Sequence, residues 1–139
     1  TINNILFVHA GVSPELVRRE LKIKEVNQVF HERIIGRDFN SFSEEKELNF
    51  LSGNDGPVWY RGYFADSAPG ISSLDSILGF YGKEHIVVGH TPHKSIMILP
   101  GNKVIGIDTG MGFGQSGNML LYKKGQFYIG SITGVRSKL

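Results

Sequence analysis

The sequence contains no cysteine. This absence excludes a disulfide scaffold, cysteine-ligated zinc, an iron–sulfur cluster and a thiol nucleophile within these 139 residues. A chain without cysteine also fits the reducing cytoplasm, which is the location that we expect.

The sequence also lacks a strong excess of charge of either sign and a long apolar run. Lysine and arginine number 15, and aspartate and glutamate number 13, so the formal net charge is +2. The basic residues are scattered, and nucleic acid is therefore not an expected partner. No apolar run approaches the ~20 residues of a membrane helix, and the first residues carry no charged leader, so we expect neither a membrane partner nor secretion.

What is present points to one folded domain over 1–139. Hydrophobic residues make up 40% of the sequence, which is enough for an ordinary core, and the length suits a single domain. Glycine is abundant, with 18 residues, so we expect many turns or sites where the backbone approaches its neighbours closely.

Hydrophobic patterning predicts an α+β fold in which helices come first and a mainly antiparallel β-meander follows. A short buried strand over 5–8 precedes the helices, and Ser13-Pro14 is typical of a helix N-terminus. The expected helices cover 14–22, 26–34, a segment after the Ser41/Glu44 capping box, and 72–81, and the expected strands cover 58–64, 85–88, 95–99, 103–107, 118–122 and 126–132.

Two histidines occupy matching positions in the sequence. His9 follows the run Leu6-Phe7-Val8, and His90 follows Val87-Val88-Gly89, so each imidazole is expected near the end of a strand. Side chains at the carboxyl ends of strands commonly bind metals and substrates in α/β proteins, which makes both residues candidate metal ligands. Burial against a backbone carbonyl is the alternative, and the residues alone leave both interpretations open. His93 shares a metal with His90 only if its loop folds back.

Arg61 is the most informative charge in the chain. It lies among aromatic residues in the segment 58–63, and a guanidinium in such surroundings needs a partner. A phosphate or a carboxylate would supply matching acceptors, and Trp59 and Tyr60 beside it would accept a peptide or a base. The alternative is a surface cation–π contact in which Trp59 and Tyr63 cover the arginine stem.

Two further segments contain a carboxylate or clustered glycines at the end of a predicted strand. Asp108 begins Asp108-Thr109-Gly110, where it can act as a ligand or general base, although an Asx-type turn that supports the loop is favoured. Gly112-x-Gly114-x-x-Gly117 has the glycine spacing of the dinucleotide-binding fingerprint. That fingerprint requires a helix after it, and a strand is expected here, so the match is rejected. We interpret this second segment as a glycine-rich loop.

Four segments, in order, resemble the second half of the calcineurin-like metallophosphoesterases, and most closely the bacterial branch of the PPP-type protein phosphatases, including the Shewanella-like group. They are Leu6-Phe7-Val8-His9-Ala10-Gly11-Val12-Ser13-Pro14, Gly56-Pro57-Val58-Trp59-Tyr60-Arg61-Gly62, Val88-Gly89-His90-Thr91-Pro92 and Ile107-Asp108-Thr109-Gly110. The resemblance implies the C-terminal half of an αββα sandwich. It also implies hydrolysis of phosphomonoesters by a metal-bound hydroxide, as in serine/threonine protein phosphatases.

The resemblance further implies a set of site residues and cofactors. The full enzyme would hold two divalent metal ions, manganese, iron or zinc, with His9 and His90 as ligands of one ion. Arg61 would clamp the substrate phosphate, with Tyr60 beside it, and Asp108 would support the site. The implied substrate is a phosphoprotein or a small phosphoester.

The other motifs of that family, Gly-Asp-x-His, Gly-Asp-x-x-Asp-Arg and Gly-Asn-His-Glu, do not occur in these 139 residues. We therefore expect the chain to be one half of a longer enzyme and inactive alone, binding one ion weakly or none. Exposed sheet edge would favour self-association of such a chain. The second hypothesis is a non-catalytic binding or regulatory module derived from a phosphatase half.

Overall fold

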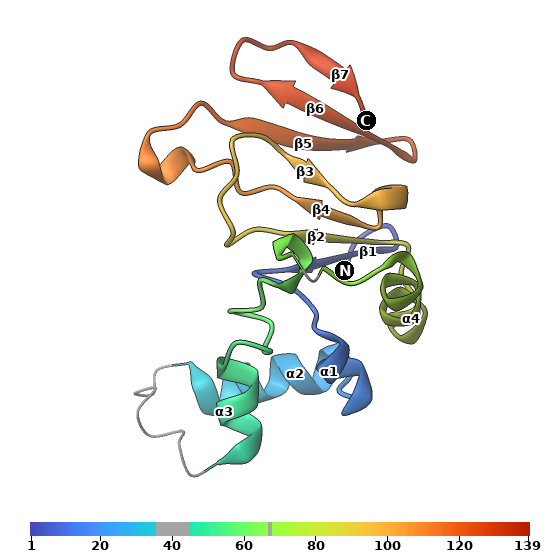
Figure 1. Ribbon diagram of the computed structural model, residues 1–139, viewed down its shortest axis with the longest axis vertical. Helices are drawn as coiled ribbons and strands as arrows, with labels where there is room; N and C mark the ends of the chain where they lie inside the picture. Colours follow the sequence, from blue (N-terminus) through green and yellow to red (C-terminus); the bar gives the residue numbers. More distant parts are fainter. Residues whose placement is uncertain (36–44, 67) are drawn as a thin grey trace.

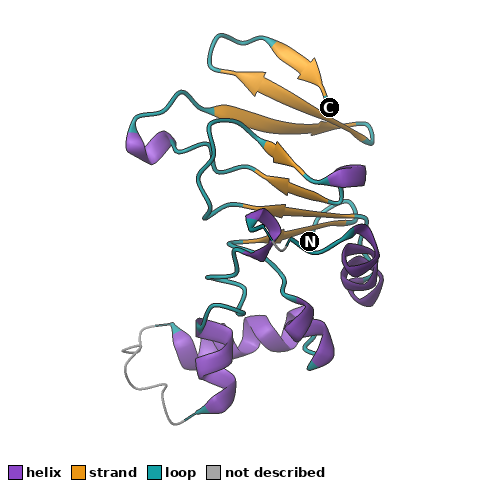
Figure 2. Ribbon diagram, in the orientation of Figure 1, coloured by secondary structure: helices purple, strands orange, loops and turns teal. Residues whose placement is uncertain are grey.

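The computed structural model describes residues 1–35, 45–66 and 68–139. Its strands form a four-stranded sheet in the order β1-β2-β4-β3 and a three-stranded sheet in the order β5-β6-β7 (Figures 1 and 2). The strands are β1 (Ile5–Val8), β2 (His85–Val88), β3 (Met97–Ile98), β4 (Val104–Gly106), β5 (Asn118–Lys123), β6 (Gln126–Ser131) and β7 (Arg136–Lys138).

Most of the helices gather at one end of the molecule. The helices are α1 (Pro14–Arg18), α2 (Ile23–Val29) with a π-helical turn over Phe30–Ile34, α3 (Lys46–Ser52) and α4 (Ile71–Tyr81), and short 3-10 turns occur at Gly62–Phe64, Pro100–Asn102 and Met111–Phe113. Figure 1 shows α1, α2 and α3 at one end, the three-stranded sheet at the other, and the four-stranded sheet between them. No helix in the described part of the chain is long and apolar enough to cross a membrane.

The four-stranded sheet is mainly parallel. β1 pairs with β2 and β2 pairs with β4 in parallel, and only β3 runs antiparallel to its neighbour β4. The connection from β1 to β2 carries α1 to α4, and a connection of this length lets the chain return to pair in parallel. The prediction of helices first and a mainly antiparallel meander is therefore wrong. Periodicity identifies a strand, but the connections decide its partner and direction.

Both faces of the four-stranded sheet are covered. Side chains alternate between the two faces along β1 and β2, as expected for strands buried on both sides. One face packs against helix residues in a core that includes Leu6, Ile86, Val88, Val104, Leu74, Ile77 and Leu78. The other face packs against the three-stranded sheet through Ile5, Val87, Ile96, Ile105 and Phe127.

Several local signals in the sequence are confirmed. The Ser13 side chain caps α1 by accepting from the Leu16 N–H, and Pro14 is the first helical residue. Gly82 ends α4 in the left-handed region with φ 59. The hairpin between β5 and β6 turns at Lys124 and Gly125, which both have positive φ, as two-residue hairpins require. The Ser41/Glu44 capping box lies outside the described residues.

The predicted strand over 58–64 is wrong. This segment forms turns that end in the 3-10 turn Gly62–Phe64. Tyr60 and Tyr63 are both buried, with 9% and 2% of their surface exposed, so the buried side chains recur every three residues rather than alternating. A Cβ at Gly62 would lie 2.3 Å from the Tyr60 hydroxyl, so glycine permits this compact turn. Aromatic content favoured a strand, and tertiary packing overrides that propensity.

Candidate functional site

Three connecting segments meet at the carboxyl ends of β1 and β2. The first follows β1 and begins with His9, the second spans 55–64 and contains Arg61, and the third follows β2 and contains His90. The parallel register pairs Val8 with Val88, which brings the first and third segments to the same edge of the sheet. The Gly89 N–H donates to the His9 carbonyl at 2.9 Å and fixes their relative position.

The segment 55–64 is held against the segment after β1 by backbone and side-chain hydrogen bonds. The backbone N–H groups of Ala10 and Gly11 donate to the Pro57 carbonyl at 2.9 and 3.3 Å. The Tyr63 hydroxyl accepts from the Val12 N–H at 3.1 Å and donates to the Val12 carbonyl at 2.8 Å. These bonds fix the backbone on both sides of Arg61 relative to the chain that carries His9.

Gly11 makes the close approach of these two segments possible. A Cβ at this position would lie 2.7 Å from Cδ1 of Tyr60 and 2.9 Å from Cε2 of Tyr63. Only glycine lets the backbone pass this near to the two buried rings. The sequence showed a glycine after His9 but not the aromatic side chains that require it.

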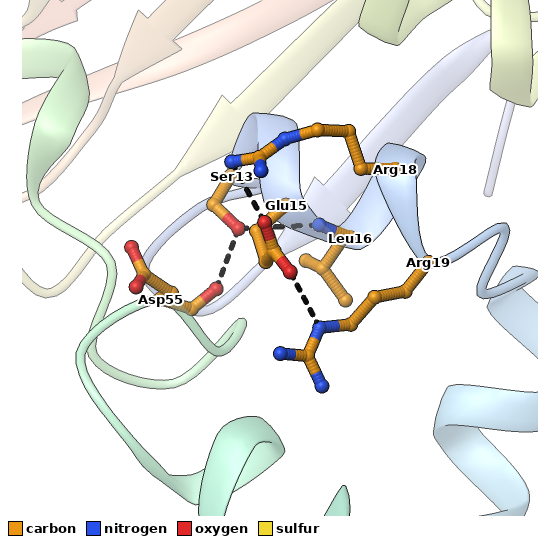
Figure 3. A network of polar contacts seen from close by, with 6 residues as sticks. All are labelled: Ser13, Glu15, Leu16, Arg18, Arg19 and Asp55. Carbon is orange, nitrogen blue, oxygen red and sulfur yellow. Dashed lines mark hydrogen bonds and ion pairs between the residues drawn. The ribbon is translucent and has the colours of Figure 1, made fainter.

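Ser13 adds a side-chain link between the same segments (Figure 3). Its hydroxyl donates to the Asp55 carbonyl at 2.7 Å while capping α1. Glu15 in the first turn of α1 pairs with Arg18 and Arg19, each at 2.7 Å, and the hydrogen bond from Arg19 holds the pKa of this carboxyl below its ordinary value. Such exposed pairs contribute little stability, so the Ser13 bonds matter more for the position of residues 55–64.

His9 and His90 lie in direct contact. Nε2 of His9 and Nδ1 of His90 are 3.0 Å apart, so one of the two nitrogens carries the proton that the other accepts. Their ring centroids are 4.8 Å apart. The prediction that both imidazoles lie at strand ends and near each other is confirmed.

The backbone at His90 is strained. Its φ is 65, in the left-handed region that non-glycine residues rarely adopt, and the Thr91 N–H donates to the Gly89 carbonyl at 2.7 Å across it. A turn closed over three residues with positive φ at its centre is uncommon and costs free energy. Nε2 of His90 is buried and has no hydrogen-bond partner among the described residues. Such strain in a candidate site is consistent with a functional constraint on the ring.

The electrostatic surroundings of His90 favour its neutral form. Burial lowers the pKa of His90, and the positive charges of Arg61 and His9 lower it further, whereas Asp108 opposes the shift. The Arg61 side chain is exposed, so its guanidinium is accessible to a ligand. Trp59 also contacts His90: the two rings are edge-on, with a centroid distance of 5.0 Å.

Asp108 supports a neighbouring loop, as the favoured interpretation predicted. Its carboxylate accepts from the Gly110 N–H at 3.0 Å, which is the Asx-type turn, and its carbonyl accepts from the His93 N–H at 2.9 Å. His93 packs against Phe64 with ring centroids 4.6 Å apart and does not join the pair of His9 and His90.

The two aromatic residues that precede Arg61 differ in burial. Tyr60 is buried and packs edge-on against Tyr63, with ring centroids 5.1 Å apart, whereas 45% of Trp59 is exposed. Burial raises the pKa of Tyr60. The substrate contact predicted for Tyr60 therefore fits Trp59 better. Sequence reasoning missed the positioning contacts of Tyr63 and Ser13, because the local sequence pattern does not indicate a contact with a residue about 40 or 50 positions away.

An apolar cavity lies beside the candidate site. It has a volume of about 250 Å³ beside β1 and α2, and His9 is among its lining residues, with Leu6, Val8, Val26 and Phe30. Arg61, Trp59 and His90 do not line it. The cavity therefore does not include the guanidinium of Arg61.

The predicted pair of divalent metal ions does not fit the residues present. In residues 1–35, 45–66 and 68–139, no group of three or more His, Cys, Asp or Glu side chains is placed to hold an ion. His9 and His90 supply two imidazoles and use one nitrogen each on one another. Metal ions in proteins take four or more ligands, so the predicted manganese, iron or zinc cofactor is wrong for these residues.

No protein-family model matches this chain, and no curated protein matches it either.

Solved structures of a phosphatase do match. One is a cold-active protein tyrosine phosphatase of a psychrophilic Shewanella species, with 36% sequence identity and a TM-score of 0.91. A point mutant of a cold-active protein tyrosine phosphatase gives the same identity and score. The match covers 99% of this chain and 41% of each of those chains. The fold described above is therefore that of a part of these phosphatases, and this chain spans less than half of their length.

This match corrects the earlier resemblance. The matched structures are described as protein tyrosine phosphatases, and none is described as a calcineurin-like or PPP-type metallophosphoesterase. The prediction of a C-terminal half of a metallophosphoesterase sandwich is replaced by the tyrosine phosphatase fold matched over nearly the whole chain. The predicted metal-dependent, serine/threonine type of phosphatase is corrected on the same finding.

Proposed function

We propose that this chain supplies the phosphate-binding and proton-transfer side chains of a protein phosphatase whose substrates are phosphomonoesters, including phosphotyrosine. One observation carries the proposal: an accessible guanidinium and a contacting pair of imidazoles lie at one sheet edge, in a chain that shares its fold with tyrosine phosphatases. Residues 1–139 would form one part of the domain, since the chain spans 41% of the matched chains.

Arg61 is the phosphate-binding residue of this proposal. A guanidinium donates two parallel hydrogen bonds to two oxygens of a phosphate, which positions the ester as well as neutralising its charge. The compact turn around Gly62 and the bonds of Tyr63 fix the backbone from which Arg61 extends. A fixed backbone reduces the conformational freedom that binding has to remove.

His9 and His90 are the proton-transfer residues. The lowered pKa of His90 keeps its ring neutral near neutral pH, so the pair can accept a proton from an attacking water or return one to the leaving oxygen. Nε2 of His90 is buried and has no partner among the described residues, whereas His9 is exposed, so a substrate would meet the pair through His9. The sequence has no cysteine, so the proposal assigns no phosphocysteine intermediate to this chain.

The test measures hydrolysis of p-nitrophenyl phosphate and of a phosphotyrosine peptide by the full natural protein. Arg61→Ala should lower kcat/KM by roughly 100-fold to 1,000-fold, because it removes a donor that stabilises transferring phosphate charge. Arg61→Lys should retain part of this activity at a higher KM, because lysine keeps the charge and loses the fork.

Arg18→Ala is the matched control. Arg18 is also an arginine but lies at the end of α1, outside the three segments of the site; its side chain is 73% exposed, and its partner is Glu15. Its replacement should leave kcat/KM unchanged. Unchanged turnover in Arg61→Ala, in a protein that stays folded by circular dichroism, would overturn the proposal.

A further inference from the structure

Trp59 is exposed although the two tyrosines of the same segment are buried. It exposes 45% of its surface, whereas Tyr60 on one side and Tyr63 four residues later expose 9% and 2%. Its backbone is fixed by the hydrogen bond from the Trp59 N–H to the Gly56 carbonyl at 3.2 Å. An exposed indole beside a phosphate-binding arginine is available to contact an aromatic ligand.

We propose that Trp59 is a specificity-determining residue that contacts the aromatic ring of an aryl phosphate. It would favour phosphotyrosine over phosphoserine and phosphothreonine. This inference rests on the phosphatase function proposed above and adds the residue that selects the substrate class.

The contact between Trp59 and His90 places the indole beside the reacting groups. The two rings are nearly perpendicular, at 87°, with centroids 5.0 Å apart. Only part of the indole is used in this contact, since almost half of the residue stays exposed. Arg61 follows two residues later, and its charge acts on the same His90 ring. A phosphate bound by Arg61 beside the His9–His90 pair is therefore a neighbour of the indole.

The chemistry of the ester decides what reaches the indole. In an aryl phosphate the ring is bonded directly to the ester oxygen. When Arg61 holds the phosphate, the ring therefore lies next to the side chains that bind the phosphate. In phosphoserine the ester oxygen carries a methylene group, which offers little surface. Aromatic pairs prefer offset or edge-to-face contacts that exceed the effect of buried area alone, and Trp59 offers an aromatic surface of this kind.

The experiment compares phosphotyrosine and phosphoserine peptides of otherwise identical sequence as substrates of the full natural protein. Trp59→Ala should lower kcat/KM for the phosphotyrosine peptide roughly threefold to tenfold more than for the phosphoserine peptide, mainly through KM. Trp59→Phe should restore most of the preference, because it keeps an aromatic face. Each variant is compared with the unaltered protein on the same peptide, so the intrinsic reactivity of the two esters cancels.

Two controls separate the possible outcomes. Inhibition by inorganic phosphate should be the same in Trp59→Ala as in the unaltered protein, since phosphate has no ring. Tyr122→Ala, which truncates a partly exposed aromatic residue in the three-stranded sheet, should leave the preference unchanged.

Failure of this inference differs from failure of the proposed function. Equal loss on both peptides, or no loss on either, in a protein whose turnover still depends on Arg61 would show that Trp59 only orients His90 or contacts nothing. Absence of hydrolysis of every ester by the unaltered protein, or turnover independent of Arg61, would overturn the proposed function itself and this inference with it.

Discussion

At the scale of single residues, His90 combines the features that mark a site. The sequence placed it after a strand in the same setting as His9, and the structure confirms that the two rings meet. The positive φ, the buried Nε2 and the charge of Arg61 could not be predicted, because each depends on segments remote in sequence. These three features distinguish His90 from the other histidines and identify it as the central residue of the proposed chemistry.

The lowered pKa of His90 predicts a pH dependence of stability. As the pH falls through 6.5, the ordinary pKa of histidine, the unfolded chain takes up a proton at this ring before the folded protein does. The unfolded state therefore binds more protons, and the free energy of unfolding falls as the pH falls from about 7 to about 5. Urea denaturation across this range should show the loss in the unaltered protein.

His90→Asn should reduce that loss, because asparagine does not titrate and tolerates positive φ. His31→Asn, at an exposed position in the π-helical turn, is the control and should retain it. The same pH slope in His90→Asn and in the unaltered protein would contradict the assignment.

At the scale of elements, three signals for boundaries in the sequence are confirmed. The Ser13 cap, the Gly82 stop and the Lys124-Gly125 turn were all readable, since each depends on the few residues around it. α1 is shorter than predicted and ends at Arg18, where Glu20 soon turns the chain with φ 54. The segment 58–64 was misread because its conformation is set by Tyr63 and Gly11, which meet across about 50 residues of sequence.

Tyr63 is predicted to be a positioning residue for Arg61. Tyr63→Phe removes a hydroxyl that both accepts from and donates to Val12, and it leaves two buried backbone groups without that partner. We expect a loss of about 1 to 3 kcal/mol in the free energy of unfolding, measured by urea denaturation. Burial raises the pKa of Tyr63, so its hydroxyl remains a donor throughout the neutral range. We also expect lower kcat/KM in the full natural protein.

Tyr81→Phe is the matched control for this change. The Tyr81 hydroxyl donates to the Leu21 carbonyl at 2.9 Å, outside the three segments that form the site, and burial raises the pKa of Tyr81 to about 12. Its loss should reduce stability and leave kcat/KM unchanged. Equal effects of the two substitutions on kcat/KM would argue against a positioning role for Tyr63.

At the scale of the whole molecule, the packing of the two sheets makes the fold one unit. Phe127 of β6 is 4% exposed and packs with Ile5, Val87 and Ile105 from the four-stranded sheet. The sequence marked all four as apolar residues in strands but could not show that they face one another. This contact joins the three-stranded sheet to the sheet whose edge carries the candidate site.

Phe127→Ala should lower the free energy of unfolding by about 3 to 5 kcal/mol, because it leaves a cavity between the sheets. Thermal unfolding followed by circular dichroism and by the fluorescence of Trp59 should show one transition at a lower temperature by both probes. Phe113→Ala, at a position 79% exposed, should change stability by less than about 0.5 kcal/mol. Two separate transitions in the unaltered protein would show instead that the sheets unfold independently.

The sequence by itself determined the boundaries at Ser13, Gly82 and Lys124-Gly125, the presence of Arg61 among aromatic residues, and the lack of any thiol. These properties follow from nearest neighbours and from composition, where chain geometry allows few choices. The tertiary structure alone decided the parallel pairing of β1, β2 and β4, the turn that carries Arg61, the contacts of Trp59 and His9 with His90, and the effect of the Arg61 charge on that ring. Contacts between distant segments are selected by how buried surfaces fit together, and that fit is a property of the folded chain as a whole.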